Sequence, residues 1–152
     1  MNIDRTDVAI LDALAENSRV TASELVSTIN LSIPSINKRI AKLKESGLIN
    51  RFTITTRPEY LGTPLISFIM LFIDDFENDE KFRKSIKTNR RVLECYSVSG
   101  EYDYLIKICS KSMSDLEATL SALKKEFGVT KSFTMFCMNE IIPNRPALPD
   151  EV

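Results

Sequence analysis

The sequence predicts an α+β protein with two domains, a small helical domain followed by a mixed one. Three helices can be identified before residue 48, each with its own capping signal. Residues 56–64 ("TRPEYLGTP") then hold two prolines and a glycine, which is typical of a domain boundary. Beyond it, apolar segments follow in the order strand, helix, strand, strand, helix, strand. The expected parts are a first domain at 1–56, a linker at 57–64, a second domain at 65–140 and an extended C-terminal tail at 141–152.

The first two helices are predicted from capping boxes and apolar spacing. Asp4 is the expected cap of the first helix, with Asp7 three residues later, and apolar residues then recur at helical spacing as far as residue 15. Thr21 and Glu24 form the second capping box, before a short helix. Asn30 tolerates a left-handed backbone, so we expect it to end this helix and turn the chain.

The third helix is predicted within residues 31–50, "LSIPSINKRIAKLKESGLIN". Ser32 is its expected cap, Pro34 falls in the first turn, where a missing N–H costs little, and Gly47 is the expected left-handed residue after its end. Its apolar residues form one stripe: Ile33, Ile36, Ile40 and Leu43. The side chain of Lys38 lies opposite this stripe.

Charge is concentrated on this third helix. The chain has a net charge of −1, and residues 1–31 carry −3. Residues 32–51 carry five cations against one anion, a net charge of +4. Local charge of this kind favours a polyanionic partner. A solvent-exposed basic face with no partner is the alternative reading of the same pattern.

Two capped helices joined by a short turn, the second of them basic, indicate a helix-turn-helix that inserts into the DNA major groove. Residues 48–55 ("LINRFTIT") alternate as a strand does, so we expect a basic wing after the helix. Ser35, Asn37 and Lys38 are the expected base-reading residues, and Arg39, Lys42, Lys44 and Arg51 the expected phosphate contacts. The full set of DNA-binding candidates is Ser32, Pro34, Ser35, Asn37, Lys38, Arg39, Lys42, Lys44 and Arg51.

The second domain is predicted to be a ferredoxin-like βαββαβ unit. Its expected strands are 65–73, 92–98, 104–109 and 129–138. Its expected helices are 78–88 and a second one that begins after a Ser114 cap and ends at Gly128. The helices of such a unit cover one face of the sheet, so we expect the other face, with its Phe, Met and Ile side chains, to mediate oligomerisation.

Composition narrows the possible functions. The longest apolar run, Leu65–Ile73, is far too short to span a bilayer, and the N-terminal residues do not resemble a secretion signal, so we expect a cytoplasmic protein. The chain has no histidine, which removes the commonest general base and metal ligand and makes an enzyme less plausible. Cys95, Cys109 and Cys137 have no metal-site spacing, so we expect buried core thiols and no metal.

Three stretches resemble the Lrp/AsnC family of prokaryotic transcription regulators, the feast/famine regulatory proteins. They are "NIDRTDVAILDALAENSRVTASEL", "LSIPSINKRIAKLKESGLI" and "VLECYSVSGEYDYLIKI". The resemblance covers residues 2 to about 142, and Glu101 stands where the family usually has Asp. It implies a RAM/ACT-like second domain that binds an amino acid, and dimers that often assemble into octamers. It also implies a nucleoid-associated, cytoplasmic protein that needs no cofactor.

The turn after the second strand of this domain is the effector site that the resemblance implies. Its residues are Ser97, Ser99, Gly100, Glu101, Tyr102 and Asp103. Chemically, Asp103 is a suitable partner for the ammonium group of an amino acid, and the N–H groups around Gly100 are suitable donors to its carboxylate. The alternative is that Gly100 and Asp103 only shape a tight turn.

Three other functions remain open at this point. The first is that of an effector-independent, architectural DNA-binding protein. The second is that of an enzyme similar to the siroheme decarboxylases; the missing histidine and the intact basic helix argue against it. The third is that of a winged-helix regulator of another class; the "SGEYDYL" turn between two strands argues against it.

Overall fold

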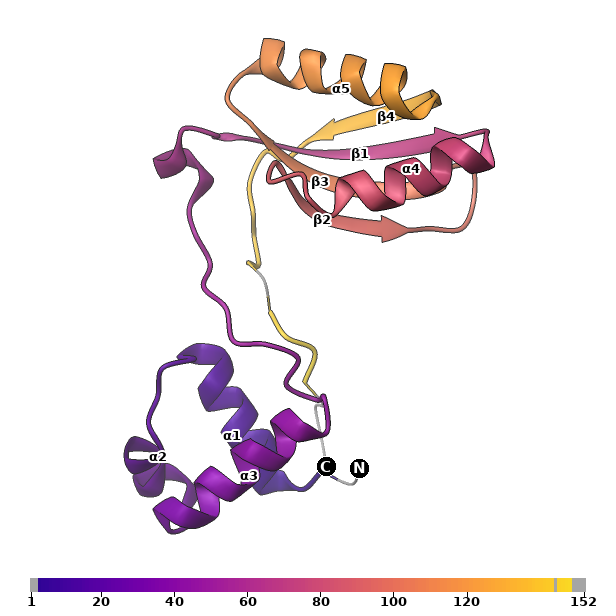
Figure 1. Cartoon of the computed structure of the whole chain (residues 1–152). Coiled ribbons are helices and arrows are strands. Elements are labelled where there is room, and N and C mark those ends of the chain that lie inside the picture. Colours follow the sequence, from indigo (N-terminus) through magenta and orange to yellow (C-terminus); the bar gives the residue numbers. More distant parts are fainter. Residues whose placement is uncertain (1–2, 144, 149–152) are drawn as a thin grey trace. The chain divides into compact units, whose positions relative to one another are not determined.

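The computed structural model describes residues 3–143 and 145–148. Residues 1–2 of the predicted first domain, and residues 144 and 149–152 of the predicted tail, lie outside the described residues. The chain divides into two compact units, Met1–Thr55 with Ile142–Val152, and Thr56–Ile141 (Figure 1). Each unit has its own hydrophobic core.

The first unit contains α1 (Arg5–Glu16), α2 (Ala22–Ile29) and α3 (Ile33–Glu45). All three predicted caps are confirmed: the side chains of Asp4, Thr21 and Ser32 each accept a hydrogen bond from the backbone N–H three residues later. Asn30 has the predicted left-handed backbone, with φ of 49°. The turn between α2 and α3 is therefore only three residues long, as a helix-turn-helix requires.

Apolar side chains from all three helices form the core of the first unit. Ile10, Leu11, Leu14 and Leu43 are buried in it. Leu148 also packs against this cluster, so the described part of the tail, predicted only to be extended, contributes to the first unit. Ile33 departs from the predicted apolar stripe, because its side chain is 43% exposed.

The strand predicted over residues 48–55 is not formed. Residues 50–57 have no regular secondary structure, so the winged helix-turn-helix of the first unit lacks a regular strand in this segment of the described chain. The side chains that alternate in the sequence are largely exposed, Phe52 by 45% and Ile54 by 82%. A strand needs a partner for its backbone hydrogen bonds, and none of the described strands pairs with this segment.

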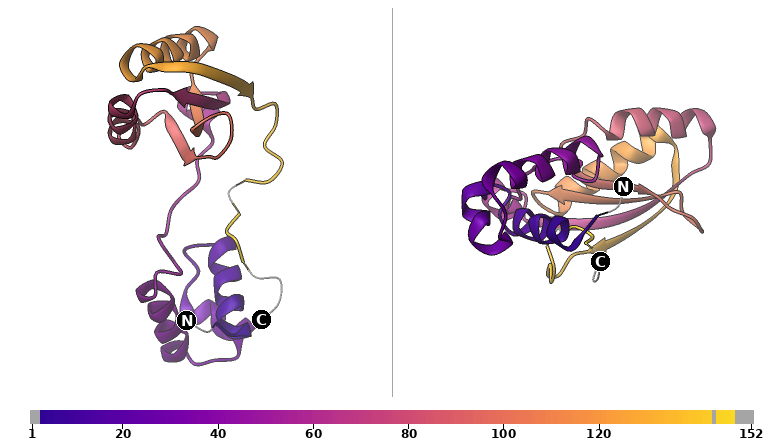
Figure 2. Two further views of the ribbon diagram at one scale, coloured as in Figure 1. Left: turned by 90° about the vertical axis from the view of Figure 1, so that its right-hand side faces the viewer. Right: turned by 90° about the horizontal axis from the view of Figure 1, so that it is seen from below.

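The second unit has the predicted βαββαβ order. After a short 3₁₀ helix, η1 (Pro58–Leu61), come β1 (Leu65–Ile73), α4 (Phe76–Ile86), β2 (Val92–Ser97), β3 (Tyr104–Ser110), α5 (Met113–Phe127) and β4 (Val129–Phe136). The strands lie in the order β2-β3-β1-β4 and every neighbouring pair is antiparallel. Helices α4 and α5 lie against the same face of this sheet (Figure 2).

Two helix starts in this unit differ from the prediction. The helix α4 begins two residues before Asn78, because the carboxylate of Asp75 accepts a hydrogen bond from the N–H of Asn78. The cap of α5 is Ser112 and not Ser114: its hydroxyl accepts a hydrogen bond from the N–H of Asp115. Two Asp residues precede α4, and Ser110 and Ser112 precede α5; sequence alone does not distinguish among such candidate caps.

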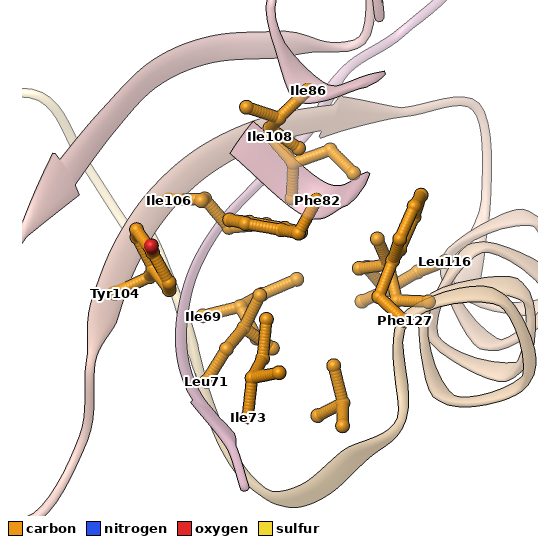
Figure 3. Packing of buried hydrophobic residues seen from close by; sticks show 12 residues of the cluster. Ile69, Leu71, Ile73, Phe82, Ile86, Tyr104, Ile106, Ile108, Leu116 and Phe127 are labelled. Atoms are coloured by element: carbon orange, nitrogen blue, oxygen red, sulfur yellow. The ribbon is translucent and has the colours of Figure 1, made fainter. Parts of the chain in front are cut away.

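The core of the second unit lies between the sheet and its two helices (Figure 3). The ring of Phe82 in α4 is fully buried, with its centroid 4.6 Å from that of Tyr104 and 5.7 Å from that of Phe127. Alternate residues of β1, including Ile69, Leu71 and Ile73, point into this core.

The opposite face of the sheet carries the apolar side chains that the prediction placed there. Phe68 lies opposite Met135, and Met70 opposite Phe133, across the β1–β4 pair. None of the helices in the second unit covers this face. Phe133 and Met135 remain partly exposed as a result.

The prediction of three buried thiols is wrong for two of them. Cys109 in β3 is buried, Cys137 is partly exposed and Cys95 is exposed. The exposure of Cys95 follows from the position of β2, which lies at the edge of the sheet and has only one neighbouring strand. Alternation within a strand identifies the face of a residue but not whether its strand is central.

Candidate DNA-binding surface and effector site

The helix α3 is fixed on one side by packing and exposed on the other. Ile36 and Leu43 are fully buried against the rest of the first unit. The residues predicted to read bases, Ser35, Asn37 and Lys38, are all exposed on the remaining surface. Because the N-terminal turn of α3 is exposed and capped, the helix has the form that enters a major groove about 12 Å wide.

The cap of α3 uses two of the candidate residues. The Ser32 hydroxyl accepts a hydrogen bond from the N–H of Ser35 (3.4 Å) and lies 2.9 Å from the Ser35 hydroxyl. Pro34, in the first turn, has no N–H to leave unpaired. These contacts give Ser32 and Pro34 a role in starting the helix.

Three of the predicted phosphate contacts are exposed cations near one another in sequence. Lys42 and Arg51 form no ion pair within the described part of the chain, and neither does Lys38. The Lys44 ammonium lies 5.8 Å from the centre of the Phe52 ring, a cation–π contact that leaves its charge available. Lys42 and Lys44 also lie in the last turn of α3, where the helix dipole favours cations.

Carboxylates at the start of α1 bind the guanidinium of Arg39, another of the predicted phosphate contacts. Its Nη1 lies 2.7 Å from Oδ1 of Asp7 and 2.9 Å from Oδ2 of Asp4. The Asp7 carboxylate is buried, and the pKa of Arg39 is raised by its hydrogen bonds to Asp7 and then Asp4. The pKa of Asp4 is lowered, first by the Asp7 N–H and then by Arg39.

The prediction for Asp4 and Asp7 was limited to capping the first helix. The structure adds that they lie beside the candidate DNA-binding face. One hollow is lined by residues of α1, of the turn and of α3: Asp4, Asp7, Leu31, Ser35, Lys38, Arg39 and Lys42. Arg39 lies 32 positions after Asp7 in the sequence, so no local pattern could have identified this contact.

The candidate effector residues lie at the end of β2 and in the turn between β2 and β3. Ser97, Ser99, Gly100 and Glu101 are exposed, and Tyr102 and Asp103 are partly buried. Gly100 has φ of 124°, a conformation that L residues with a side chain rarely adopt. A Cβ on Gly100 would meet no atom within 4 Å, so the space beside this backbone is open.

Asp103 is hydrogen-bonded to β1 and to the residue that follows β2. Its Oδ2 accepts a hydrogen bond from the N–H of Ile73 (2.8 Å), and its own N–H donates to the carbonyl of Leu71 (2.9 Å). Its carbonyl accepts from the N–H of Val98 (2.9 Å). These contacts establish the turn-shaping role that the sequence left open, while the binding of an ammonium group by Asp103 stays a prediction.

Sequence reasoning missed one cation at this turn. The Lys131 ammonium, from β4, lies 3.1 Å from Oε2 of Glu101 and 4.7 Å from the centre of the Tyr102 ring. The pairing of β4 with β1 brings it there, since Lys131 lies opposite Phe72. Nothing near Lys131 in the sequence indicates this position.

A separate cluster of charges lies between α4 and β3. The Tyr104 hydroxyl donates a hydrogen bond to Asp79, and Nε of Arg83 donates to the other oxygen of the same carboxylate (2.8 Å). Burial, followed by the hydrogen bond to Asp79, raises the pKa of Tyr104. We assign this cluster a structural role because its groups are mutually paired.

The described residues, 3–143 and 145–148, contain neither a candidate metal site nor a membrane-spanning helix. No group of three or more His, Cys, Asp or Glu residues among them is placed to hold a metal ion. No helix in the same ranges is long and apolar enough to cross a bilayer.

The fold is that of a helix-turn-helix domain followed by a ferredoxin-like βαββαβ domain. Comparison with known families agrees: residues 3–50 match the winged helix-turn-helix DNA-binding family, and residues 67–147 match the Lrp/AsnC ligand binding domain. The chain therefore belongs to the Lrp/AsnC family of DNA-binding transcription regulators.

Individual relatives are similar along most of the chain. A transcriptional regulator of Neisseria meningitidis, solved in complex with L-Met, has a TM-score of 0.89 and 29% identity and covers 97% of each chain. The LrpC structure of Bacillus subtilis has a TM-score of 0.82 and 28% identity, over 95% of this chain and 100% of that one. The leucine-responsive regulatory protein of Klebsiella pneumoniae is 29% identical over 92% of this chain and 87% of its own length.

Proposed function

We propose that this regulator reads DNA sequence with α3 and that an amino acid bound in its C-terminal domain controls that binding. The observation that carries the first part is the exposed polar face of α3, opposite the fully buried Ile36 and Leu43. Ser35, Asn37 and Lys38 read base edges. Lys42, Lys44 and Arg51 contact phosphates, which position the protein without adding sequence information.

The second part of the proposal places the effector at the turn of residues 97–103. N–H groups around Gly100, beside open space, are the donors to the effector carboxylate. Asp103 accepts the effector ammonium through Oδ1, while Oδ2 keeps the hydrogen bond from Ile73. A carboxylate already fixed by a backbone N–H loses little freedom when it binds a cation. The L-Met complex of the Neisseria relative supports an amino acid as the ligand class.

The open face of the sheet is the proposed dimer contact. Its Phe68, Met70, Phe133 and Met135 side chains would be removed from water by a second copy of the chain. A dimer presents α3 twice, so we expect a two-fold-related DNA site with half-site centres about 34 Å apart or a multiple of that. Further assembly to an octamer is the expected higher state.

Coupling between the two ends of the chain requires different assemblies. An effector changes DNA binding only to the extent that it binds one assembly or conformation more tightly than another. We expect the amino acid to shift the balance between assemblies that space their α3 helices differently. No catalytic step, cofactor or membrane enters this function, and we place it in the cytoplasm.

Two measurements test the proposal. Fluorescence anisotropy with a duplex selected by the protein from a random library, and with a random duplex of equal length, measures sequence preference across a salt series. Equal affinity for the two duplexes would contradict sequence-specific binding. A thermal-shift screen against the twenty amino acids tests the effector, because a ligand of the folded state raises its apparent stability. A screen with no shift at millimolar concentrations would favour the effector-independent, architectural function.

A further inference from the structure

The contact between Arg39 and α1 joins the candidate recognition helix to the start of the first helix. One nitrogen of the guanidinium contacts both carboxylates, Asp7 at 2.7 Å and Asp4 at 2.9 Å. Asp4 and Asp7 are themselves joined, since each accepts a hydrogen bond from the backbone N–H of the other. The three residues therefore form one network that closes the N-terminus of α1 against the middle of α3.

The position of Arg39 on α3 determines what this network restrains. Arg39 lies three residues after Ile36 and four before Leu43, at the edge of the buried stripe. Apolar packing is non-directional, so these two residues resist separation of the helices better than rotation of α3 about its axis. A charged hydrogen bond has a preferred geometry and does resist rotation.

Small rotations of α3 matter for base readout. Side chains extend about 5–6 Å from a helix axis, so a rotation of about 20° moves them by about 2 Å. A hydrogen bond to a base edge tolerates only a few tenths of an ångström. Contacts of lysine with phosphate tolerate such a shift, because an ammonium acts as a point charge on a flexible stem.

The same network keeps two carboxylates compatible with a nearby polyanion. Asp4 and Asp7 line the same hollow as Ser35, Lys38 and Lys42. Asp7 is only 6% exposed, so water screens the charge of its carboxylate poorly. Without Arg39, two adjacent negative charges would lie beside the surface that approaches DNA.

We propose that Arg39 is a positioning residue for base readout, acting through Asp7 and Asp4, and that it makes no phosphate contact. The inference rests on the proposed role of Ser35, Asn37 and Lys38 in reading bases. It predicts that loss of the network weakens binding to the preferred sequence more than binding to random DNA.

The test compares Arg39→Gln, Arg39→Lys, Asp7→Asn and Asp4→Asn in the full chain, with Lys42→Gln as the matched phosphate-contact control. Asn caps a helix about as well as Asp, so Asp4→Asn removes the ion pair and keeps the start of α1. The readouts are the affinity ratio between the selected and random duplexes and the salt slope on the random duplex. Far-ultraviolet circular dichroism checks that each variant is folded.

We expect the affinity ratio to fall about tenfold in Arg39→Gln and Asp7→Asn, the size of one lost base contact, and less in Asp4→Asn. Their salt slopes stay at the wild-type value. Lys42→Gln should instead weaken both duplexes equally and reduce the slope by about 0.9. The double variant of Arg39→Gln with Asp7→Asn should lose no more than either single variant, because both remove the same network.

Different failures lead to different conclusions. If Arg39→Gln weakens both duplexes equally and reduces the salt slope as Lys42→Gln does, then Arg39 contacts phosphate and the inference is wrong. It is also wrong if folded Asp7→Asn and Asp4→Asn keep the wild-type ratio. Should Arg39→Gln prove unfolded, the two Asp variants decide alone. A wild-type protein that does not distinguish the duplexes would overturn the proposed base readout, and with it this role of Arg39.

Discussion

Replacement of Asp103 separates the shaping of the β2–β3 turn from the binding of an effector. Asp103→Ala removes the oxygen that accepts the hydrogen bond of Ile73 N–H at 2.8 Å. Ile73 is 8% exposed, so little water can replace this acceptor. A buried N–H without a partner costs about 1–3 kcal/mol, so we expect the free energy of unfolding of the second unit to fall by about 2 kcal/mol.

Asp103→Asn is the matched control. Its amide oxygen occupies the same place as Oδ2 and accepts the same hydrogen bond, so we expect a loss below about 0.5 kcal/mol. The charge, however, is gone. If Asp103 binds the ammonium of the effector, Asp103→Asn should therefore keep its stability and lose most of its affinity for the amino acid.

The assay is urea unfolding followed by circular dichroism, with thermal shift on addition of the effector. A loss of about 2 kcal/mol corresponds to a fall in Tm of about 8–16 °C for a domain of this size. Equal stability of Asp103→Ala and wild type would refute the structural role drawn from the hydrogen bonds. An unchanged effector response in Asp103→Asn would refute ammonium binding and leave Asp103 as a turn residue alone.

Three further predictions concern the core, the acid limit of stability and base readout. Phe82→Ala should cost the second unit about 3–5 kcal/mol in urea unfolding, because it leaves a cavity between Tyr104 and Phe127; a loss below about 1 kcal/mol would contradict the described packing. The pKa of Asp115 is lowered, above all by the Lys111 N–H, and the pKa of Asp4 is lowered, above all by the Asp7 N–H. The stability that these two carboxylates add is therefore present above about pH 4 and is lost as the pH falls; unfolding midpoints that stay constant from pH 5 to about 2 would contradict this. Asn37→Ala should change the sequences selected from a random library without changing the salt slope; an unchanged selection would remove Asn37 from the base readers.

The sequence contained the information for most of the local structure. Asp4, Thr21 and Ser32 cap their helices as predicted, and Asn30 turns the chain as predicted. The βαββαβ order was also predictable from periodicity. The interactions behind these features join residues within three or four positions of one another, so the sequence displays both partners together.

The wing illustrates what such patterns omit. Residues 48–55 have the alternation of a strand, yet they form none in the described chain. Alternation reports only that one side of a segment is apolar. Whether a strand forms depends on a partner elsewhere, and that partner is not visible in the local pattern.

The charged residues show the same division. Sequence alone showed that residues 32–51 carry a net charge of +4 and predicted that α3 is the helix to place against DNA. Only the tertiary structure decided that Arg39 binds Asp7 and Asp4, that Asp103 binds the backbone of Ile73, and that Lys131 lies over the turn. The range of these contacts is the reason: each joins groups about 30 or more positions apart in the sequence, which packing brings within 5 Å.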